Sequence, residues 1–276
     1  MLALVVTVPI DEVEVASDEL WALGVVAIEE RAVDELLVEL WTSLGDDVQP
    51  ADMVAGGWSE RWPIRMVAVD ESVAETWREF ARPIAIDADL FIRPRWVPFD
   101  APSGATVLHI EPGSTFGMGD HPTTMLSLRA LRRVVTPGCS VLDVGCGSGV
   151  LAIAACRFGA GDALGIDISP AAVPVTLDNA TANGVATVVS ASTEPLSEVA
   201  AAHEGSFDVV AANILAPTLI ALSDDLRRVV KPGGVLIISG ILAEAHQHVL
   251  DALAPLEVQC TDTLDGWVAV TLSAPR

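Results

Sequence analysis

The sequence predicts an α/β protein: a doubly wound, mostly parallel sheet with helices on both faces, preceded by a small α+β domain. Three observations predict it. From Cys139 onward, short apolar strand patterns alternate with helical patterns, and a glycine-rich loop follows the first of these strands. Repeated β-α units of this kind form parallel sheets. Before that region, strand-like runs surround a single helical pattern, which indicates a separate small domain.

The first 70 residues are expected to form the small domain. Apolar runs predict strands at residues 2–9, 24–30, 35–41 and 65–71, with a helix between residues 12 and 23. Apolar residues at helical spacing in residues 72–83 predict a connecting helix that stops near Pro83. Two further strands follow at residues 88–96 and 106–112. We therefore divide the chain into a domain at 1–70, a linker helix with connecting strands at 71–110, and a larger domain at 111–276.

The larger domain alternates strands and helices in order. Strands are predicted at residues 139–144, 163–168, 186–192, 207–213 and 235–240, and helices at residues 150–158 and 170–184, through Leu226 and Val229, and at residues 244–253. In open sheets of parallel strands, ligands bind beyond the carboxyl ends of the strands. The residues that follow each strand are therefore the candidate site residues.

The loop Asp143 to Gly149, DVGCGSG, follows a buried-looking strand and opens a helix, as a nucleotide-type site requires. Gly145 and Gly147 allow positive φ and close approach of the backbone to a ligand. Asp167 lies at the end of the next strand, 22 residues after Gly145, and is placed to accept hydrogen bonds from ribose hydroxyls. Val150 stands where the dinucleotide pattern has its third glycine, so the loop favours S-adenosylmethionine over NAD.

Asn213 ends the strand FDVVAAN and is expected to project into the same crevice as Gly145 and Asp167. Its side chain carries both a carbonyl acceptor and amide donors, which suits the holding of an amine nucleophile. Capping of the following helix explains an asparagine at this position equally well.

The charge of the chain is strongly acidic, with 38 Asp and Glu against 15 Lys and Arg and a net charge of −23. Residues 1–70 hold 15 acidic and 3 basic residues, a balance of −12. This argues against nucleic acid as the main ligand, because a surface that follows phosphates needs clustered Lys and Arg. A basic protein partner suits it better, although charge for solubility or a bias of the lineage explains it as well.

Several classes of protein are excluded by what the sequence lacks. A hydrophobic fraction of 51% includes no charge-free run long enough to span a membrane, since the longest candidate, Val209 to Ser223, is short and interrupted. The amino terminus runs from a brief apolar stretch into acidic residues, unlike a secretory signal. The four cysteines and the histidines show no zinc spacing. We expect a cytoplasmic protein without a metal.

These motifs resemble those of the ribosomal protein L11 methyltransferase family, the class I S-adenosylmethionine-dependent protein methyltransferases named PrmA. The similarity runs through EPGSTFGMGDHPTT, VLDVGCGSGVLAIAA, GIDISPAAVPVTLDNATANGV, FDVVAANILAPTL, KPGGVLIISGIL and GWVAVTL, and covers roughly residues 70–276. The resemblance implies a seven-stranded Rossmann-like sheet, S-adenosylmethionine as cofactor, and recognition of the protein substrate by the amino-terminal domain.

The resemblance also implies roles for single residues. A loop containing HPTT folds over the methionine end of the cofactor, so Thr124 is implied to bind it opposite Gly145. Asp167 is implied to hold the ribose, and Asn213 to line the methyl-transfer position as both a catalytic and a cofactor-binding residue. The chain departs from the family at Met118 and Asp120, where a threonine and a neutral residue are usual. These departures leave the choice of substrate open.

Two aromatic or titratable side chains near the motifs have alternative interpretations. His121 is interpreted as a general base or as a residue that orders the loop, and its place beside Pro122 favours the ordering role. Trp267, in the last strand, is interpreted as a wall of the crevice or as a buried core indole, of which we favour the core.

The target class follows from the residues after Asn213. Enzymes of this fold that methylate conjugated nitrogens typically carry Asn-Pro-Pro-aromatic there, whereas this chain has Ile214, Leu215 and Ala216. We expect methylation of lysine side chains and α-amino groups on a basic protein, with ribosomal protein L11 as the substrate. The alternatives are another protein such as the electron-transfer flavoprotein β subunit, a small metabolite, an NAD-dependent oxidoreductase, or a catalytically silent module that only binds the cofactor.

Overall fold

The structure is a computed structural model that describes residues 2–22, 25, 28–34, 36–42, 61–68, 82–111 and 121–276. The chain divides into two compact units, Met1–Ala81 and Arg82–Arg276. The helix predicted at residues 72–83 lies outside the described residues, apart from its last two positions. Among the described residues, none of the helices combines the length and the apolarity that a membrane-spanning segment needs.

The first unit is a four-stranded antiparallel sheet with a helix on one face. The strand order is β2-β3-β1-β4, with β1 at Leu2–Pro9, β2 at Ile28–Ala32, β3 at Leu37–Thr42 and β4 at Ile64–Ala68. A short 3₁₀ turn, η1 (Ile10–Glu12), leads into helix α1 (Val13–Ala22). Alternate residues of β1 and β3 pack with α1, and this core contains Leu4, Val6, Leu20, Leu40 and Trp62. The predicted α+β character of this unit therefore agrees with the structure.

The second unit opens with a three-stranded sheet. Strands β5 (Ile84–Asp87) and β6 (Leu90–Arg93) form an antiparallel hairpin, and β6 pairs in parallel with β7 (Thr106–His109). Ile86, Leu90, Ile92 and Leu108 are buried in the same cluster as residues of the large domain. The segment predicted as a linker thus contributes strands to the core of the second unit.

The large sheet of the second unit has seven strands in the order β10-β9-β8-β11-β12-β14-β13. Five are parallel: β8 (Ser140–Val144), β9 (Asp162–Ile166), β10 (Val189–Ser192), β11 (Phe207–Asn213) and β12 (Val230–Leu242). The strand β14 (Trp267–Ser273) pairs antiparallel with β12, and the edge strand β13 (Glu257–Leu264) pairs antiparallel with β14. The mostly parallel, seven-stranded fold is confirmed.

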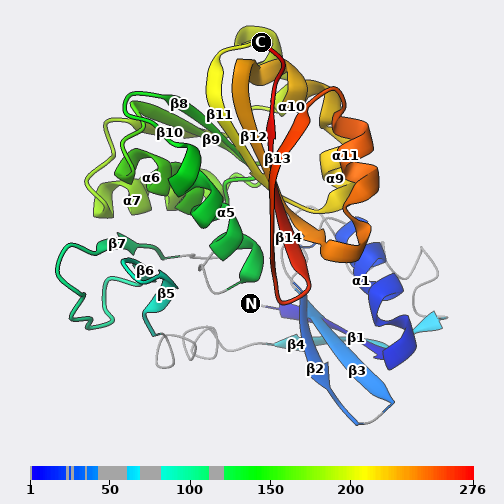
Figure 1. The fold of residues 1–276 in the computed structure, drawn as a ribbon. Helices are drawn as coiled ribbons and strands as arrows, with labels where there is room; N and C mark the ends of the chain where they lie inside the picture. The colour runs from blue at the N-terminus through cyan, green and yellow to red at the C-terminus, as the bar shows by residue number, and fades with distance from the viewer. Residues whose placement is uncertain are drawn as a thin grey trace. The chain divides into compact units, whose positions relative to one another are not determined.

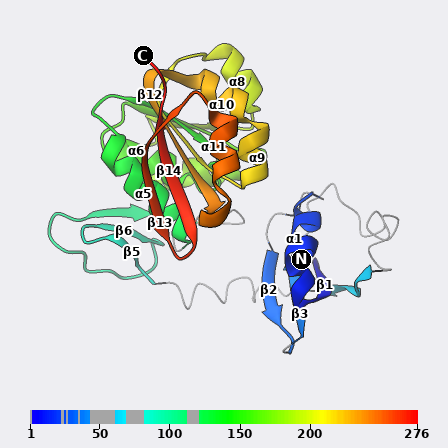
Figure 2. The same cartoon turned by 45° about the vertical axis from the view of Figure 1, so that its right-hand side comes forward.

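Helices cover both faces of this sheet, and Figures 1 and 2 each show a group of helices on either side of it. One face carries α5 (Pro122–Val134), α6 (Val150–Arg157) and α7 (Ala172–Ala182). The other carries α8 (Leu196–Ala202), α9 (Ala216–Ala221), α10 (Ser223–Val229) and α11 (Gln247–Leu253), the last preceded by the turn η2 (Ala243–Ala245). The two buried clusters on these faces are apolar, as a doubly wound sheet requires.

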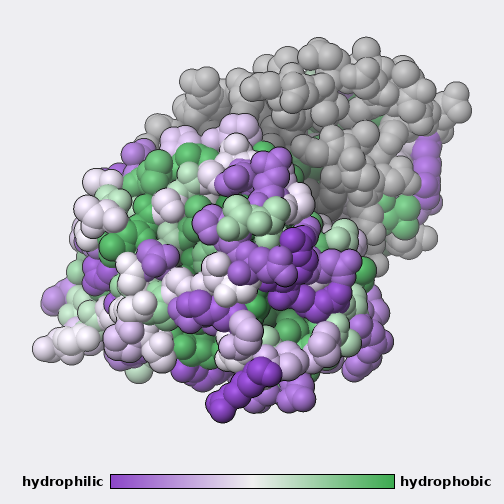
Figure 3. Space-filling view, turned by 90° about the horizontal axis from the view of Figure 1, so that it is seen from above, coloured by the Kyte–Doolittle hydropathy of each residue, from purple (hydrophilic) through white to green (hydrophobic). Residues whose placement is uncertain are grey.

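The order of strands places the candidate site. From β8 the chain winds outward to β9 and β10, and then returns to β11, which pairs with β8 on its other side. The carboxyl ends of β8 and β11 therefore flank the point where the winding reverses, the usual ligand position in such sheets. Figure 3 views the molecule from above, onto the end of the sheet that lies away from these carboxyl ends. Strongly hydrophilic side chains gather there, with apolar areas between them.

Candidate functional site

The glycine loop connects β8 to α6 with the backbone that its sequence predicts. Gly145, Gly147 and Gly149 have positive φ angles of 75°, 51° and 77°. The N–H of Gly145 donates to the carbonyl of Ile166 on β9 at 2.8 Å, which fixes the loop against the neighbouring strand. Only glycine adopts such angles without strain, so the loop sequence is a requirement of this turn.

Asp167 lies directly beside this loop, as predicted. Its Oδ2 accepts the N–H of Gly147 at 2.8 Å, and its Oδ1 accepts the N–H of Ser169 at 2.9 Å. A carboxylate has about four acceptor positions, so two backbone bonds leave capacity for a ligand hydroxyl. The structure thus brings Gly147 and Asp167 together at the carboxyl ends of β8 and β9.

Thr124 lies in the first turn of α5, which corrects the expectation that the HPTT motif is a loop. His121 is the N-cap residue: its Nδ1 accepts the N–H of Thr123 at 3.3 Å and lies 2.8 Å from the Thr123 hydroxyl. Pro122 begins the helix, where its fixed φ and missing N–H are tolerated. His121 therefore orders the start of α5, and Thr124 is held on a rigid element.

Asn213 and Thr124 meet, although they lie 89 residues apart in the sequence. The Asn213 Nδ2 lies 3.5 Å from the Thr124 Oγ1, a long hydrogen bond between β11 and α5. Helix α9 has Leu215 as its N-cap residue and no side-chain cap bond, so Asn213 does not cap it. The side chain of Asn213 therefore turns toward the start of α5 and does not cap α9.

Asp143 is a further candidate site residue, which the sequence singled out only as the start of the glycine loop. It lies between the buried residues Leu142 and Val144 of β8 and is only 1% exposed. Its Oδ2 accepts the N–H of Ala152 at 3.0 Å, but its Oδ1 has no hydrogen-bond partner among the described residues. Burial, and to a lesser degree the nearby charge of Asp167, raises the pKa of Asp143 to about 7, against the lowering effect of the Ala152 bond. An acidic residue in an apolar strand directly before the glycine loop was the available signal.

Exposed apolar side chains follow three of the parallel strands at the same edge. Ile168 comes just after β9 and is 96% exposed, Leu215 follows β11, and Leu242 ends β12. A large exposed aliphatic side chain next to Asp167 suits contact with an apolar part of a ligand. The sequence analysis passed over Ile168 because a single exposed isoleucine has no distinctive pattern.

Ile214 packs against both the glycine loop and the end of β12. A Cβ atom added at Gly145 would lie 2.5 Å from the Ile214 Cγ2, and one added at Gly240 would collide with the backbone of Ile214. Gly145 is therefore required by packing against this side chain, in addition to any approach of a ligand. The residue after Asn213 thus touches the turn that carries the candidate cofactor residues.

The remaining predicted features divide into those the structure describes and those it does not. Met118 and Asp120 lie outside the described residues. Trp267 is half-buried and its ring lies edge-on to that of His121, with centroids 4.9 Å apart, so it packs beside the start of α5. Within the described ranges, no three or more His, Cys, Asp or Glu side chains are arranged to hold a metal ion.

Comparison with known proteins identifies the family. The family model described as ribosomal protein L11 methyltransferase (PrmA) matches residues 51–275. The chain belongs to this family. The family, the methyltransferase class and S-adenosylmethionine as the methyl donor, all predicted from the motifs, are therefore confirmed.

Individual relatives agree with the family model. The chain is similar to the ribosomal protein L11 methyltransferase of Geobacter metallireducens, at 39% identity over 83% of this chain and 75% of that protein. It is 43% identical to that of Citrifermentans bemidjiense over 71% of this chain and 65% of that protein. A crystal structure of the ribosomal protein L11 methylase from Lactobacillus delbrueckii subsp. bulgaricus matches with a TM-score of 0.63 and 30% identity, over 71% of this chain and 98% of that one. The matched part of the chain thus spans about 65 to 75% of the length of these two curated relatives.

Proposed function

We propose that this methyltransferase transfers methyl groups from S-adenosylmethionine to lysine side chains and α-amino groups of ribosomal protein L11. The observation that carries the proposal is the meeting of Asn213 with Thr124 at the carboxyl end of β11, beside the glycine loop. This position is where the winding of the sheet reverses, which supports our placing the methyl-transfer point beside the Asn213 carboxamide. The names of the relatives above supply the candidate substrate.

The residues present fit a cofactor with a cationic end and an aromatic end. The buried Asp143 Oδ1 offers an unused acceptor to an ammonium group, and Ile168 offers an exposed aliphatic surface to an adenine ring. We assign the ribose to Asp167, and the methionine end to Thr124 and the turn at Gly145 and Gly147. The cofactor supplies an electrophilic methyl group on a sulfonium sulfur.

The protein's own contribution to the chemistry concerns the amine. A lysine with a reference pKa near 10.4 is only about 1 part in 2,500 neutral at pH 7, equivalent to roughly 4 to 5 kcal/mol. We assign the carbonyl oxygen of Asn213 to accept an N–H from the amine and aim its lone pair, because the Nδ2 of the same side chain is engaged by Thr124. Leu215, which is 46% exposed, provides apolar surroundings that disfavour the protonated amine.

The residues after Asn213 support an aliphatic amine as the target. Ile214 and Leu215 stand where a planar slot for a conjugated nitrogen would need prolines, and Ile214 is committed to packing against Gly145. A flat aromatic slot is therefore absent from this part of the described chain. Lysine and α-amino groups fit such a position better than a planar amide or base.

We assign recognition of the substrate to the acidic amino-terminal domain at residues 1–70. The net charge of −12 on these residues suits binding of a basic ribosomal protein. The absence of direct nucleic-acid binding and a cytoplasmic location remain predictions from composition. The larger domain at residues 111–276 then carries the transfer chemistry.

The direct test is to incubate the purified protein with methyl-labelled S-adenosylmethionine and lysate from cells that lack this enzyme. The labelled band is identified by mass spectrometry. We expect one dominant band, ribosomal protein L11, labelled on lysine and at its amino terminus. Labelling of a different protein would replace the substrate, and cofactor binding without any labelled protein would make the chain a silent binding module.

A further inference from the structure

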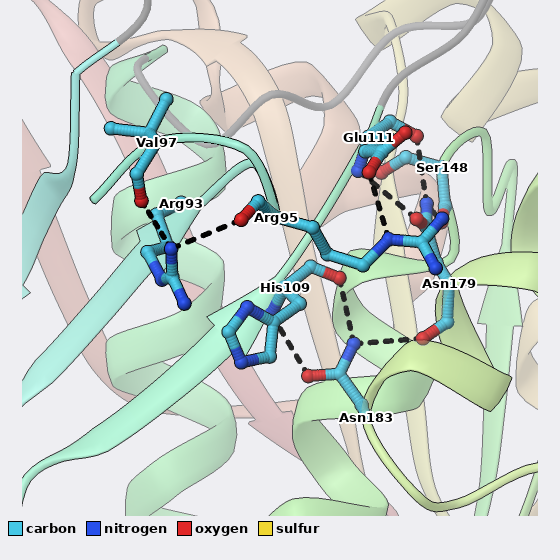
Figure 4. A network of polar contacts seen from close by, with 8 residues as sticks. All are labelled: Arg93, Arg95, Val97, His109, Glu111, Ser148, Asn179 and Asn183. Carbon is cyan, nitrogen blue, oxygen red and sulfur yellow. Dashed lines mark hydrogen bonds and ion pairs between the residues drawn. The ribbon is translucent and has the colours of Figure 1, made fainter. Parts of the chain in front are cut away.

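Asn179 of α7 and Asn183, the C-cap residue of the same helix, bind the backbone of the segment that leaves β7. The Asn183 side chain accepts the N–H of His109 at 2.9 Å and donates to its carbonyl at 2.7 Å. One helical turn earlier, the Asn179 side chain accepts the N–H of Glu111 at 3.0 Å and donates to its carbonyl at 2.8 Å. Figure 4 shows both amides facing this backbone, with the Arg95–Glu111 ion pair beside them.

The spacing of the two asparagines matches that of the strand they bind. Four residues of helix rise about 6 Å, and two residues of strand rise about 6.6 Å. Residues 109 and 111 present their N–H and carbonyl groups to the same side, so the two amides replace a neighbouring strand there. The opposite edge of β7 is already paired with β6.

Each asparagine makes one further bond, and only that of Asn179 reaches the glycine loop. The Asn183 Nδ2 donates to the carbonyl of Asn179 at 2.8 Å, whereas the Asn179 Nδ2 donates to the carbonyl of Ser148 in the loop at 2.9 Å. Three residues earlier on α7, the Thr176 hydroxyl donates to the carbonyl of Gly147 at 3.2 Å. Helix α7 thus holds the carbonyl groups of the loop, while Asp167 holds the N–H of Gly147.

We infer that Asn179 is a positioning residue for the cofactor site, which ties the orientation of the glycine loop to the backbone at Glu111. The inference rests on the proposed function, because it takes the loop as the place where S-adenosylmethionine binds. Asn179 is only 1% exposed and uses both of its amide hydrogens, so no single substitution reproduces its three bonds. It does not touch the reacting atoms, and it acts through the carbonyl of Ser148.

The matched pair Asn179→Ala and Asn183→Ala tests this. Each variant loses two bonds to the backbone at His109 or Glu111 and one further bond, which runs to the glycine loop in Asn179→Ala and to the Asn179 carbonyl in Asn183→Ala. Both are measured well below their melting temperatures. We expect the Kd and the KM for S-adenosylmethionine to rise about tenfold or more in Asn179→Ala and less than about threefold in Asn183→Ala, with kcat at saturating cofactor near that of the wild type.

Equal changes in cofactor affinity in the two variants would overturn the inference, since a merely structural role predicts equal effects. If Asn179→Ala does not fold, amide hydrogen exchange on the wild type tests the same inference. Amide hydrogen exchange with and without S-adenosylmethionine should show added protection at Glu111 and less at His109, because only Asn179 touches the loop. Unchanged exchange at Glu111 would contradict it.

The test of Asn179 and the test of the proposed function can fail independently of each other when the wild type binds the cofactor. If the wild type binds the cofactor but does not methylate ribosomal protein L11, the proposed substrate fails while the affinity comparison still decides the role of Asn179. If the wild type does not bind S-adenosylmethionine, both fail together.

Discussion

At the scale of single residues, two carboxyl groups beside one glycine loop are held in opposite ways. Both oxygens of Asp167 accept backbone N–H groups. Asp143 is buried with one oxygen unpaired, and its pKa is raised to about 7. Asp143 is therefore a buried carboxyl group with an unused acceptor, and we expect a cation bound beside it to stabilise its ionised form.

The substitution Asp143→Asn should stabilise the protein without ligand at pH 8. The pKa of Asp143 is near 3.8 in the unfolded chain and about 7 in the folded protein, so the folded state binds more protons between these values. Wild-type stability therefore falls as pH rises from about 4 to 7, by up to about 4 kcal/mol from this group, and the substitution removes that loss.

Melting temperatures of both proteins from pH 4 to pH 8 check this. The advantage of Asp143→Asn should grow across that range, and S-adenosylmethionine should stabilise the variant less than the wild type. A difference between the two proteins that stays constant with pH would show that the pKa of Asp143 is the same in the folded and unfolded states.

Removal of the Asp167 carboxylate should weaken cofactor binding. Asp167→Ala loses the assigned bonds to the ribose and also releases the N–H of Gly147. We expect a loss of about 1 to 3 kcal/mol in binding free energy, as for charge-assisted hydrogen bonds. Calorimetry with S-adenosylmethionine measures it, and an affinity equal to that of the wild type would refute the assignment.

At the scale of elements, the glycine loop and the end of β11 are coupled by direct packing. Gly145→Ala should destabilise the protein by about 1 to 2 kcal/mol from its positive φ, with more from the collision with Ile214. Ile214→Ala removes the colliding Cγ2, so the double variant should lose less stability than the sum of the two single variants. Urea unfolding of all four proteins measures this, and strict additivity would mean that the loop and Ile214 do not interact.

The elements with regular patterns were the ones the sequence could predict. Strand β1, helix α1 and strand β11 have nearly the bounds expected from their apolar periodicity. Helix α5 was missed because its first turn, Pro-Thr-Thr, has the composition of a loop and depends on the His121 cap. Strand β13 was missed because most of its residues are exposed or half-exposed and show no apolar run.

The predicted single helix through Leu226 and Val229 was wrong in one respect. The structure has two helices, α9 and α10, which meet at Leu222 and Ser223. Asp224 and Asp225 lie in the first turn of α10, where acidic side chains favour the start of a helix. That local signal was present, but the continuous apolar spacing obscured it.

The sequence predicted the parts of the candidate site that follow from backbone conformation and motif spacing. It did not predict the parts that depend on contacts between residues far apart in the sequence. The positive φ angles of the glycine loop and the nearness of Asp167 to it followed from the spacing of the motif. The contact between Asn213 and Thr124 could be predicted only with the strand order of the folded sheet. The unpaired oxygen of Asp143 and the bonds of Asn179 depend on burial in three dimensions, which periodicity does not encode.

At the scale of the whole molecule, the chain has two units with separate cores. We assign substrate recognition to the first unit, and cofactor binding and methyl transfer to the second. The core of the first unit lies between α1 and its sheet, and the second unit contains all of the candidate cofactor residues. Deletion of residues 1–81 should therefore leave S-adenosylmethionine binding in place and abolish modification of intact ribosomal protein L11. Calorimetry and a methylation assay measure the two properties, and retained modification would detach the first unit from substrate recognition.

The measurement that tests the central claim most directly is the intact mass of purified ribosomal protein L11 after incubation with S-adenosylmethionine and either the wild type or Asn213→Ala. The wild type should add mass in steps of one methyl group, located on lysine and the α-amino group. Asn213→Ala should add far less, at a cofactor affinity closer to that of the wild type. Methylation at the wild-type rate by Asn213→Ala, or no added mass with the wild type, would contradict the claim that Asn213 and Thr124 mark the site of methyl transfer.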